Sequence, residues 1–320
     1  MGGSGTASGR GAGDERMSRA MHAGQVTVTT AALAGAVARQ FPQLPAGEVV
    51  EVASAGTVVA PFRIGPSLLA RVPLVPRTGR RAEVQVEAEG RHALVLGGRL
   101  PVAVPRLMVV GRPFDWYDGV WSLWTWLEGR YLDRVLEEDA AACDRGVLAV
   151  DLARVLLAQR SLPADGGWSG TGRGGRPLTD SDGVRTAIRA GAHLVDPVAA
   201  TRVWESALAA PALVGPPTSV NGDALPGNVL ISDGRLSGLV DVSEPVVGDP
   251  ASDLQPAWVV FDEPERSAFR EAMALDEAAW QRGRGWAFEM AVGGLHYYEH
   301  TNPGFFRMAR RTLHRLVATS

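Results

Sequence analysis

The chain has little cysteine and no long apolar run, and each shortage excludes a class of protein. Its 320 residues include a single cysteine, Cys143, which has no second cysteine for an internal disulfide. We therefore expect a reducing, cytoplasmic location. No apolar run approaches the roughly 20 residues of a membrane-spanning helix. The N-terminus has no apolar stretch behind its charges, so no secretory signal is predicted.

The chain also lacks a strong excess of charge of either sign. Its 32 basic and 35 acidic residues give a formal net charge of -3, and the basic residues are scattered along the sequence. This pattern does not indicate a nucleic-acid partner. The apolar fraction of 46% is that of a globular protein, and the length suits a two-lobed enzyme or two modest domains.

The order of apolar and turn-forming segments predicts two differently built parts. Residues 1–20 are rich in Gly, Ser and Arg and are expected to form a disordered tail. Apolar spacing then predicts helices over 30–41 and 82–96, with short strands at 49–53, 61–64, 67–72, 107–110 and 121–126. Beyond Glu128-Gly129 the sequence becomes mainly helical, with helices predicted over 144–159, 182–194 and 196–208 and through most of 251–317.

The most informative stretch is VNGDALPGNVL, which runs from Val220 to Leu230. In it Asp223 lies five residues before Asn228, and Asp241 follows a second apolar run. Kinase-type phosphoryl transfer uses one carboxylate to accept a hydroxyl proton, and an Asn and an Asp to hold magnesium. The spacing therefore predicts Asp223 as the catalytic base and Asn228 and Asp241 as metal ligands.

A plain surface turn is the alternative interpretation, because Asn, Gly, Asp and Pro are all common in turns. The flanking sequence favours the catalytic interpretation. Residues 229–231 and 236–240 read as two strands joined by a turn at 232–235. Folding this hairpin would bring Asp223, Asn228 and Asp241 to one end.

With the Leu-Pro-Gly between them, these residues resemble the catalytic loop of small-molecule kinases. From Met21 to the C-terminus the chain is similar to the aminoglycoside phosphotransferase-like family. The resemblance implies an α+β, two-lobed protein-kinase-like fold. Its small β-rich N-lobe (21–126) would bind the nucleotide, and its larger, mostly helical C-lobe (127–320) would carry the catalytic loop and the substrate side. ATP and Mg²⁺ are the implied cofactors, and a small molecule with a hydroxyl group is the implied partner.

The resemblance also implies nucleotide-binding residues in the small lobe. Residues 54–57 look like the turn that covers the nucleotide, which assigns Ser54, Gly56 and Thr57. Arg71 stands where the family has a basic residue that meets the phosphates, and Glu89 is its implied ion-pair partner. The simpler alternatives are a surface Arg on an edge strand and an exposed helical charge pair of little consequence.

Four further segments carry the resemblance. Trp124 and Trp126 lie in a stretch similar to the hinge between the lobes, where backbone groups would meet the adenine; they are equally suited to packing. Gly248–Leu254 is similar to the segment that steadies the active-site loop and opens a helix. The C-terminal stretches 280–286 and 295–303 look like helices that line the substrate side.

Three positions depart from the family pattern. Asn221 stands where His is usual, Arg71 replaces Lys, and Asp241-Val242-Ser243 replaces Asp-Phe-Gly. None of these changes removes a catalytic carboxylate or a metal ligand, so an active enzyme is expected. The departures motivate an alternative of another class, a nucleotide-binding regulator with little turnover.

An aminoglycoside is the acceptor that the resemblance implies by default. Five acidic residues could meet its ammonium groups: Asp262, Glu263, Glu265, Glu289 and Glu299. Acidic residues on helices are usually just solvated, and a macrolide or a metabolite alcohol remains open as the acceptor.

Two other motifs have less support. Residues 170–175 match G-x-G-x-x-G but lack the preceding strand and following helix of a dinucleotide site, so a flexible loop near the substrate side is expected. His296 and His300 match H-x-x-E-H, a zinc pattern. They leave open a metal-dependent hydrolase, which would need a third ligand.

Overall fold

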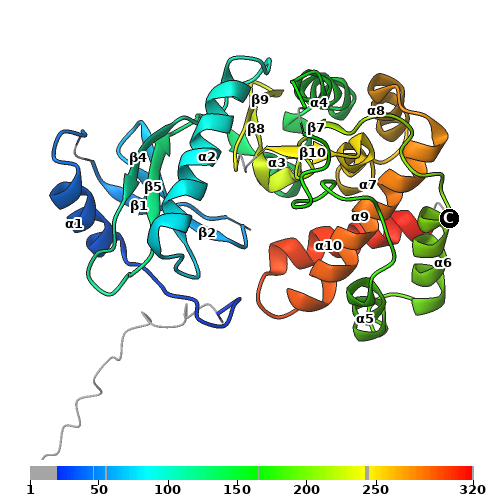
Figure 1. Ribbon diagram of the computed structural model, residues 1–320, viewed down its shortest axis with the longest axis horizontal. Helices are drawn as coiled ribbons and strands as arrows, with labels where there is room; N and C mark the ends of the chain where they lie inside the picture. The colour runs from blue at the N-terminus through cyan, green and yellow to red at the C-terminus, as the bar shows by residue number, and fades with distance from the viewer. Residues whose placement is uncertain (1–19, 46, 55, 165, 242–244, 319–320) are drawn as a thin grey trace, which may run out of the picture.

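The computed structural model describes residues 20–318, apart from residues 46, 55, 165 and 242–244. The predicted tail therefore lies almost wholly outside the described residues. Figure 1 shows two lobes along the long axis of the molecule. The first third of the chain builds the smaller lobe, and the green-to-red helices build the larger one, as the sequence led us to expect.

The small lobe is built on an antiparallel sheet of five strands in the order β1-β2-β3-β5-β4. The β2–β3 connection turns at Gly65, whose φ of 54° lies in the left-handed region that favours glycine. In Figure 1 the sheet lies between α1 and α2. The elements are β1 (Val49–Glu51), β2 (Val59–Ile64), β3 (Leu68–Pro73), β4 (Leu107–Gly111), β5 (Trp121–Thr125), α1 (Thr30–Gln40) and α2 (Gly79–Gly97).

The large lobe is mainly helical, and polar side chains begin several of its helices. Asp144, Ser181 and Asp276 each accept a hydrogen bond from a backbone N–H of the first turn, which satisfies one of the donors that a helix start leaves unpaired. The helices are α3 (Leu132–Glu138), α4 (Arg145–Arg160), α5 (Asp182–Ala190), α6 (Pro197–Leu208), α7 (Pro256–Val259), α8 (Glu265–Met273), α9 (Glu277–Tyr297) and α10 (Pro303–Ala318).

The predicted hairpin is confirmed and lies where the lobes meet. It consists of β8 (Val229–Ser232) and β9 (Arg235–Leu239), and β8 also pairs with β6 (Arg130–Tyr131). Ala103, in the segment after α2, exchanges backbone hydrogen bonds with Ser237 (2.9 Å) and Leu239 (3.0 Å). The hairpin is thereby tied to the small lobe, and the residues that follow β9 are held between the lobes.

The structure differs from the sequence predictions mainly where elements are short. The helix predicted over 182–194 ends at Ala190, since Gly191 caps it. We did not predict α3, nor the pairing of β7 (Thr218–Val220) with β10 (Val246–Gly248). Three-residue strands that pair over a long stretch of sequence leave no periodic pattern to detect. Three short 3₁₀ turns complete the fold: η1 (Ala140–Ala142), η2 (Pro226–Asn228) and η3 (Pro250–Leu254).

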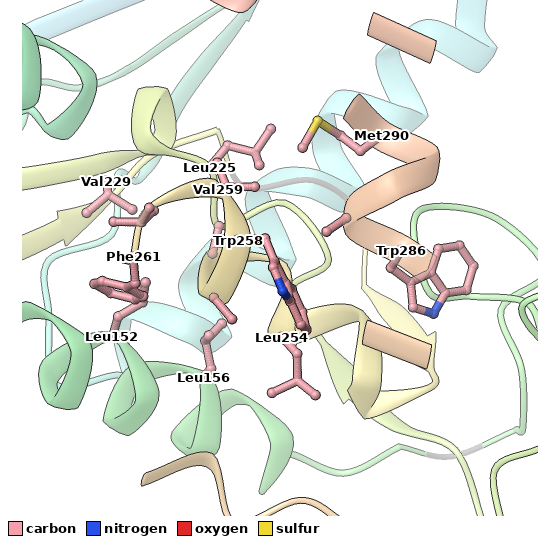
Figure 2. Close-up of a cluster of buried hydrophobic side chains, with 14 of the residues drawn as sticks. Leu152, Leu156, Leu225, Val229, Leu254, Trp258, Val259, Phe261, Trp286 and Met290 are labelled. Carbon is pink, nitrogen blue, oxygen red and sulfur yellow. The ribbon is translucent and has the colours of Figure 1, made fainter. Parts of the chain in front are cut away.

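The larger apolar cluster reaches the predicted catalytic loop. Leu225 and Val229 are 8% and 0% exposed, and Figure 2 shows them beside the side chains of α4, α7 and α9. Burying a Leu or Val side chain contributes about 1.5–3 kcal/mol, so both sides of η2 are anchored in the core. The other labelled members of this cluster are Leu152, Leu156, Leu254, Trp258, Val259, Phe261, Trp286 and Met290.

Within the described part of the chain, none of the helices combines the length and apolar character needed to cross a membrane.

Candidate active site

The predicted catalytic and metal-binding residues meet in one cleft between the lobes. Asp223, Asn228 and Asp241 all line this cavity of about 540 Å³. The Asn228 amide Nδ2 donates to the backbone oxygen of Asp223 (2.9 Å) and to its carboxylate (3.1 Å). The turn between β7 and β8 thus presents Asp223 and Asn228 together, and the β8–β9 hairpin returns Asp241 to the same place.

A buried carboxylate that sequence reasoning did not single out holds this turn. Asp253, 1% exposed, accepts hydrogen bonds from the backbone N–H groups of Asn221 (3.0 Å) and Gly222 (2.8 Å). Burial raises the pKa of Asp253 to about 6. The sequence feature that could have identified Asp253 is its place in Gly248–Leu254, which resembles a segment that steadies the active-site loop. Asp253 is the residue of that segment that contacts the loop.

Asn221 takes part in the same scaffold. Its side-chain oxygen accepts a hydrogen bond from the backbone N–H of Asp223 (3.0 Å), and its amide donates to buried Gln159 (3.3 Å). Asn221 therefore supports the turn through hydrogen bonds, as expected for a residue that replaces the usual His.

The glycine-rich loop was expected to be flexible, but it is fastened to the catalytic turn. The backbone N–H of Asp249 donates to the carbonyl of Gly174 (3.0 Å). A Cβ at Gly222 would come within 2.2 Å of the Arg173 carbonyl oxygen. Only glycine fits at position 222, where φ is 66°. These contacts hold the loop against the turn that carries Asp223.

Arg173 of this loop is a site residue that the sequence did not reveal. Its guanidinium donates to the carbonyl of Gly222 (3.0 Å) and to the carboxylate of Asp223. Burial raises the pKa of Asp223, while Arg173 and the hydrogen bond from Asn228 oppose that shift. A raised pKa moves a carboxylate toward the range in which it is a better general base.

A second arginine lies on the other side of the cleft. Arg71 forms the expected ion pair with Glu89 (3.6 Å), and both side chains are 15% exposed. Arg71 also contacts the carboxylate of Asp241, and its guanidinium lies 5.4 Å from the ring centre of Trp124. The chain contains no lysine, so a permanently charged cation at position 71 can only be an arginine.

The oxygen atoms at the cleft fit a magnesium ion. Carboxylate and amide oxygens are suitable ligands for Mg²⁺. The nitrogen of the Asn228 amide is used by Asp223, which turns its oxygen to other partners. Asp241 has a φ of 56° and a side chain that is 41% exposed. Such a backbone conformation is uncommon for Asp and is found at functional sites.

The turn assigned to the nucleotide lies at the same cleft. Ser54, Gly56 and Thr57 line it; Ala55 lies outside the described residues. A contact not foreseen from the sequence bridges the lobes at this point. The ring of His22 meets the Thr57 carbonyl (2.5 Å) and the Tyr297 hydroxyl (2.8 Å).

The two hinge tryptophans have different surroundings. Trp124 is 1% exposed and donates to Ser122 (2.8 Å), so its side chain belongs to the packed interior. Trp126 lines a small cavity at the hinge, together with Leu69, Thr125, Leu127, Tyr131, Leu230 and Val240. That cavity lies between β3 and β8, where the resemblance puts the adenine.

The five acidic residues named for an aminoglycoside do not line the cleft, among the residues that the structure describes. Asp262 is paired with Arg315 (2.6 and 3.0 Å) and Arg145 (3.1 Å). Glu289 pairs with Arg176, and Glu299 meets His193. These carboxylates therefore serve contacts within the protein. Glu263 and Glu265 lie outside the cleft, around the start of α8.

The zinc hypothesis gains no third ligand. Over the described ranges, no three His, Cys, Asp or Glu side chains come together in a group that could hold a metal ion. His300 lies 3.9 Å from Glu299, whose carboxylate faces His193.

The two-lobed fold and its polar cleft define a kinase-type phosphotransferase. The model of the phosphotransferase enzyme family matches residues 58–286, so the chain belongs to that family. It is a phosphotransferase with the kinase-like fold that the resemblance implied.

Solved structures of antibiotic phosphotransferases share this fold. The GDP complex of wild-type aminoglycoside 2'-phosphotransferase-IIIa aligns with a TM-score of 0.67 at 15% identity, covering 91% of this chain and 99% of that one. Macrolide 2'-phosphotransferase MphH from Brachybacterium faecium aligns with a TM-score of 0.56 at 22% identity, covering 89% and 97%. At these identities the likeness establishes the fold and leaves the acceptor open. No curated protein sequence matches the chain.

Proposed function

We propose that the protein transfers the terminal phosphoryl group of ATP to a hydroxyl group of a small molecule. The observation that carries the proposal is the meeting of Asp223, Asn228 and Asp241 in one cleft, where Asp241 contacts the arginine of the Arg71–Glu89 pair. Similar folds were solved with GDP, and one is a ternary complex of an aminoglycoside phosphotransferase with streptomycin and ATP. These complexes support a purine nucleotide, and we propose ATP.

In this mechanism Asp223 accepts the proton of the acceptor hydroxyl. That oxygen bonds to the terminal phosphorus while the bond from phosphorus to the ADP oxygen breaks. One Asp223 oxygen faces Arg173 and the other faces Asn228. Each carboxylate oxygen has a second lone pair for the incoming hydroxyl. The two contacts thus orient the base without occupying all of its acceptor capacity.

The remaining residues bind and position. Arg71, held by Glu89, would contact the phosphates, and the backbone of residues 54–57 would cover them. Asn228 and Asp241 would hold Mg²⁺, which neutralises phosphate charge when it is bound. The hinge around Trp126 would receive the adenine. We propose the lobe boundary there, with 21–126 serving the nucleotide and 127–320 the acceptor.

Two antibiotic classes are candidates for the acceptor within this proposal, and a metabolite alcohol is a third. Aminoglycoside and macrolide phosphotransferases both share the fold. A macrolide is the second candidate because the cleft includes apolar side chains, among them Leu136, Val260, Phe305 and Met308. An aminoglycoside would not find the acidic residues that the sequence led us to assign to it.

An ATP-consumption screen tests the proposal. The purified protein is assayed with Mg²⁺ and ATP against aminoglycosides, macrolides and simple alcohols. We expect consumption with at least one acceptor and its loss by several powers of ten in Asp223→Asn. Asp233→Asn, the same change in the exposed β8–β9 turn, is the control and should stay active. ATP binding without turnover on any acceptor would instead support the nucleotide-binding regulator.

A further inference from the structure

Five arginines of the large lobe line one side of the cleft. Arg307, Arg311 and Arg315 follow one another at four-residue intervals on α10, so they share a face of the helix. Arg134 of α3 and Arg145 of α4 line the same cavity. We call these five residues the arginine cluster. The basic residues that look scattered in the sequence are thus gathered by the fold.

The carboxylates near the arginine cluster do not balance its charge. Arg315 and Arg145 share a single carboxylate, that of Asp262. Arg307 pairs with Glu137 (2.9 Å).

Arg134 and Arg311 have no salt bridge to any residue that the structure describes. Burial lowers the pKa of Arg311, and the neighbouring cations Arg315 and Arg307 lower it further. Like charges four residues apart on a helix destabilise it. Among the described residues, the five arginines face the carboxylates of Asp262, Glu137 and Asp133, so positive charge remains for a ligand to offset.

A buried donor in the same place is also unsatisfied. The Nε of Arg145 is buried without a hydrogen-bond partner among the described residues, although other atoms of this guanidinium reach the Val260 carbonyl (2.9 Å) and Asp262. Burying a donor without a partner costs about 1–3 kcal/mol. The Arg145 guanidinium therefore keeps a polar atom that no described residue satisfies.

The arginine cluster and the residues assigned to the nucleotide line the same cavity from different lobes. Ser54, Gly56 and Thr57 belong to the small lobe, whereas the arginine cluster lies on α3, α4 and α10 of the large lobe. Figure 1 shows α10 facing the small lobe across the gap between the lobes. In the proposed reaction this is the side on which the acceptor enters.

We propose that the arginine cluster is an anion-binding subsite, and that the natural acceptor carries a carboxylate or phosphate group besides its hydroxyl. This inference rests on the proposed function, because the protein has an acceptor only if it transfers a phosphoryl group. Guanidinium groups bind carboxylate and phosphate oxygens through paired hydrogen bonds. Phe305 and Met308, which line the same cavity, would contact an apolar part of the molecule. A polycation such as an aminoglycoside would meet like charge here.

A binding titration without turnover tests the subsite. The protein is saturated with Mg²⁺ and a non-hydrolysable ATP analogue, then titrated calorimetrically with inorganic phosphate in one series and with citrate in another. We expect binding of at least one anion and a loss of at least tenfold in affinity in Arg311→Gln. The two series tell a phosphate preference from a carboxylate preference.

Arg310→Gln is the matched control. Arg310 precedes Arg311 on α10 and lines a neighbouring groove that Arg311 also borders, but it does not line the cleft, so this variant should bind the anion as the parent does. If Arg311→Gln does not fold, Arg134→Gln takes its place with the same expectation. Absence of binding at millimolar anion, equal loss in both variants, or competition with the nucleotide analogue would overturn the proposal.

A second assay separates this proposal from the proposed function. Glycerol, glycerate and glycerol 3-phosphate share a three-carbon skeleton with hydroxyl groups. Glycerol has no anionic group, glycerate has a carboxylate and glycerol 3-phosphate has a phosphate. Failure of the proposed function appears as no ATP consumption with any acceptor of any class. If the anion subsite does not exist, the calorimetric titration shows no anion binding, and this result does not depend on whether any acceptor is phosphorylated.

Discussion

Replacing Gly222 by alanine should disable the catalytic turn through a collision of about 1 Å. The new Cβ would lie 2.2 Å from the carbonyl oxygen of Arg173, whereas ordinary contacts begin at 3.4 Å. The turn or the Arg173 loop must therefore move by about 1.2 Å. A displacement of about 1 Å at a catalytic group can cost on the order of 100-fold in rate, which is about 2.7 kcal/mol in the barrier.

A second cost comes from the backbone itself. Gly222 has a φ of 66°, and a residue with a Cβ in the left-handed region costs about 1–2 kcal/mol. Gly170 separates the two effects, since its φ is 71° and a Cβ there would meet nothing within 4 Å. Gly170→Ala should lose only the conformational cost, with turnover near that of the parent.

The assay compares both variants with the parent in urea unfolding and in steady-state kinetics on one accepted substrate. We expect kcat to fall about 100-fold in Gly222→Ala alone, with a larger loss of stability than in Gly170→Ala. If the two variants were alike in kcat and in unfolding midpoint, the argument that the Arg173 loop is seated on the catalytic turn would be wrong.

Three further predictions follow from contacts around the cleft. Asn221→His should keep turnover within about tenfold, or 1.4 kcal/mol, because Asn221 serves as a scaffold; a gain of a hundredfold or more would mean that Asn221 disables the natural protein. The pKa of Asp253 is about 6 when folded against 3.8 as reference, so the folded state holds the proton more tightly and the free energy of unfolding should fall by about 3 kcal/mol in all as pH rises from well below 3.8 to well above 6. Asp253→Asn should flatten that pH dependence, and an unchanged profile would reject the assignment. His22→Ala should lower the free energy of unfolding by about 1 kcal/mol, since two hydrogen bonds are lost, one to exposed Tyr297 and one to half-buried Thr57, and Tyr297→Phe should cost about half as much; equal stability of His22→Ala and parent would show that the bridge contributes nothing.

The sequence by itself determined the catalytic turn and the hairpin that follows it, because their signals are local. Turn-forming residues between apolar strands predicted the β8–β9 hairpin, and the hairpin makes Asp223, Asn228 and Asp241 converge. Apolar periodicity predicted α1, α2 and α4 for the same reason, since a helix face repeats every few residues. The Arg71–Glu89 ion pair was predicted from the family resemblance, and it is present in the structure.

Only the tertiary structure decided what surrounds these residues. Arg173 lies 50 residues before Asp223, in a loop whose glycines read as flexibility, and its role follows from packing against Gly222. Asp262 was read as a free acid until the fold set Arg315 and Arg145 beside it. The arginine cluster was invisible because helices far apart in sequence bring its members together. Local patterns record backbone preference, whereas the charge of a cleft depends on which side chains the packing brings to it.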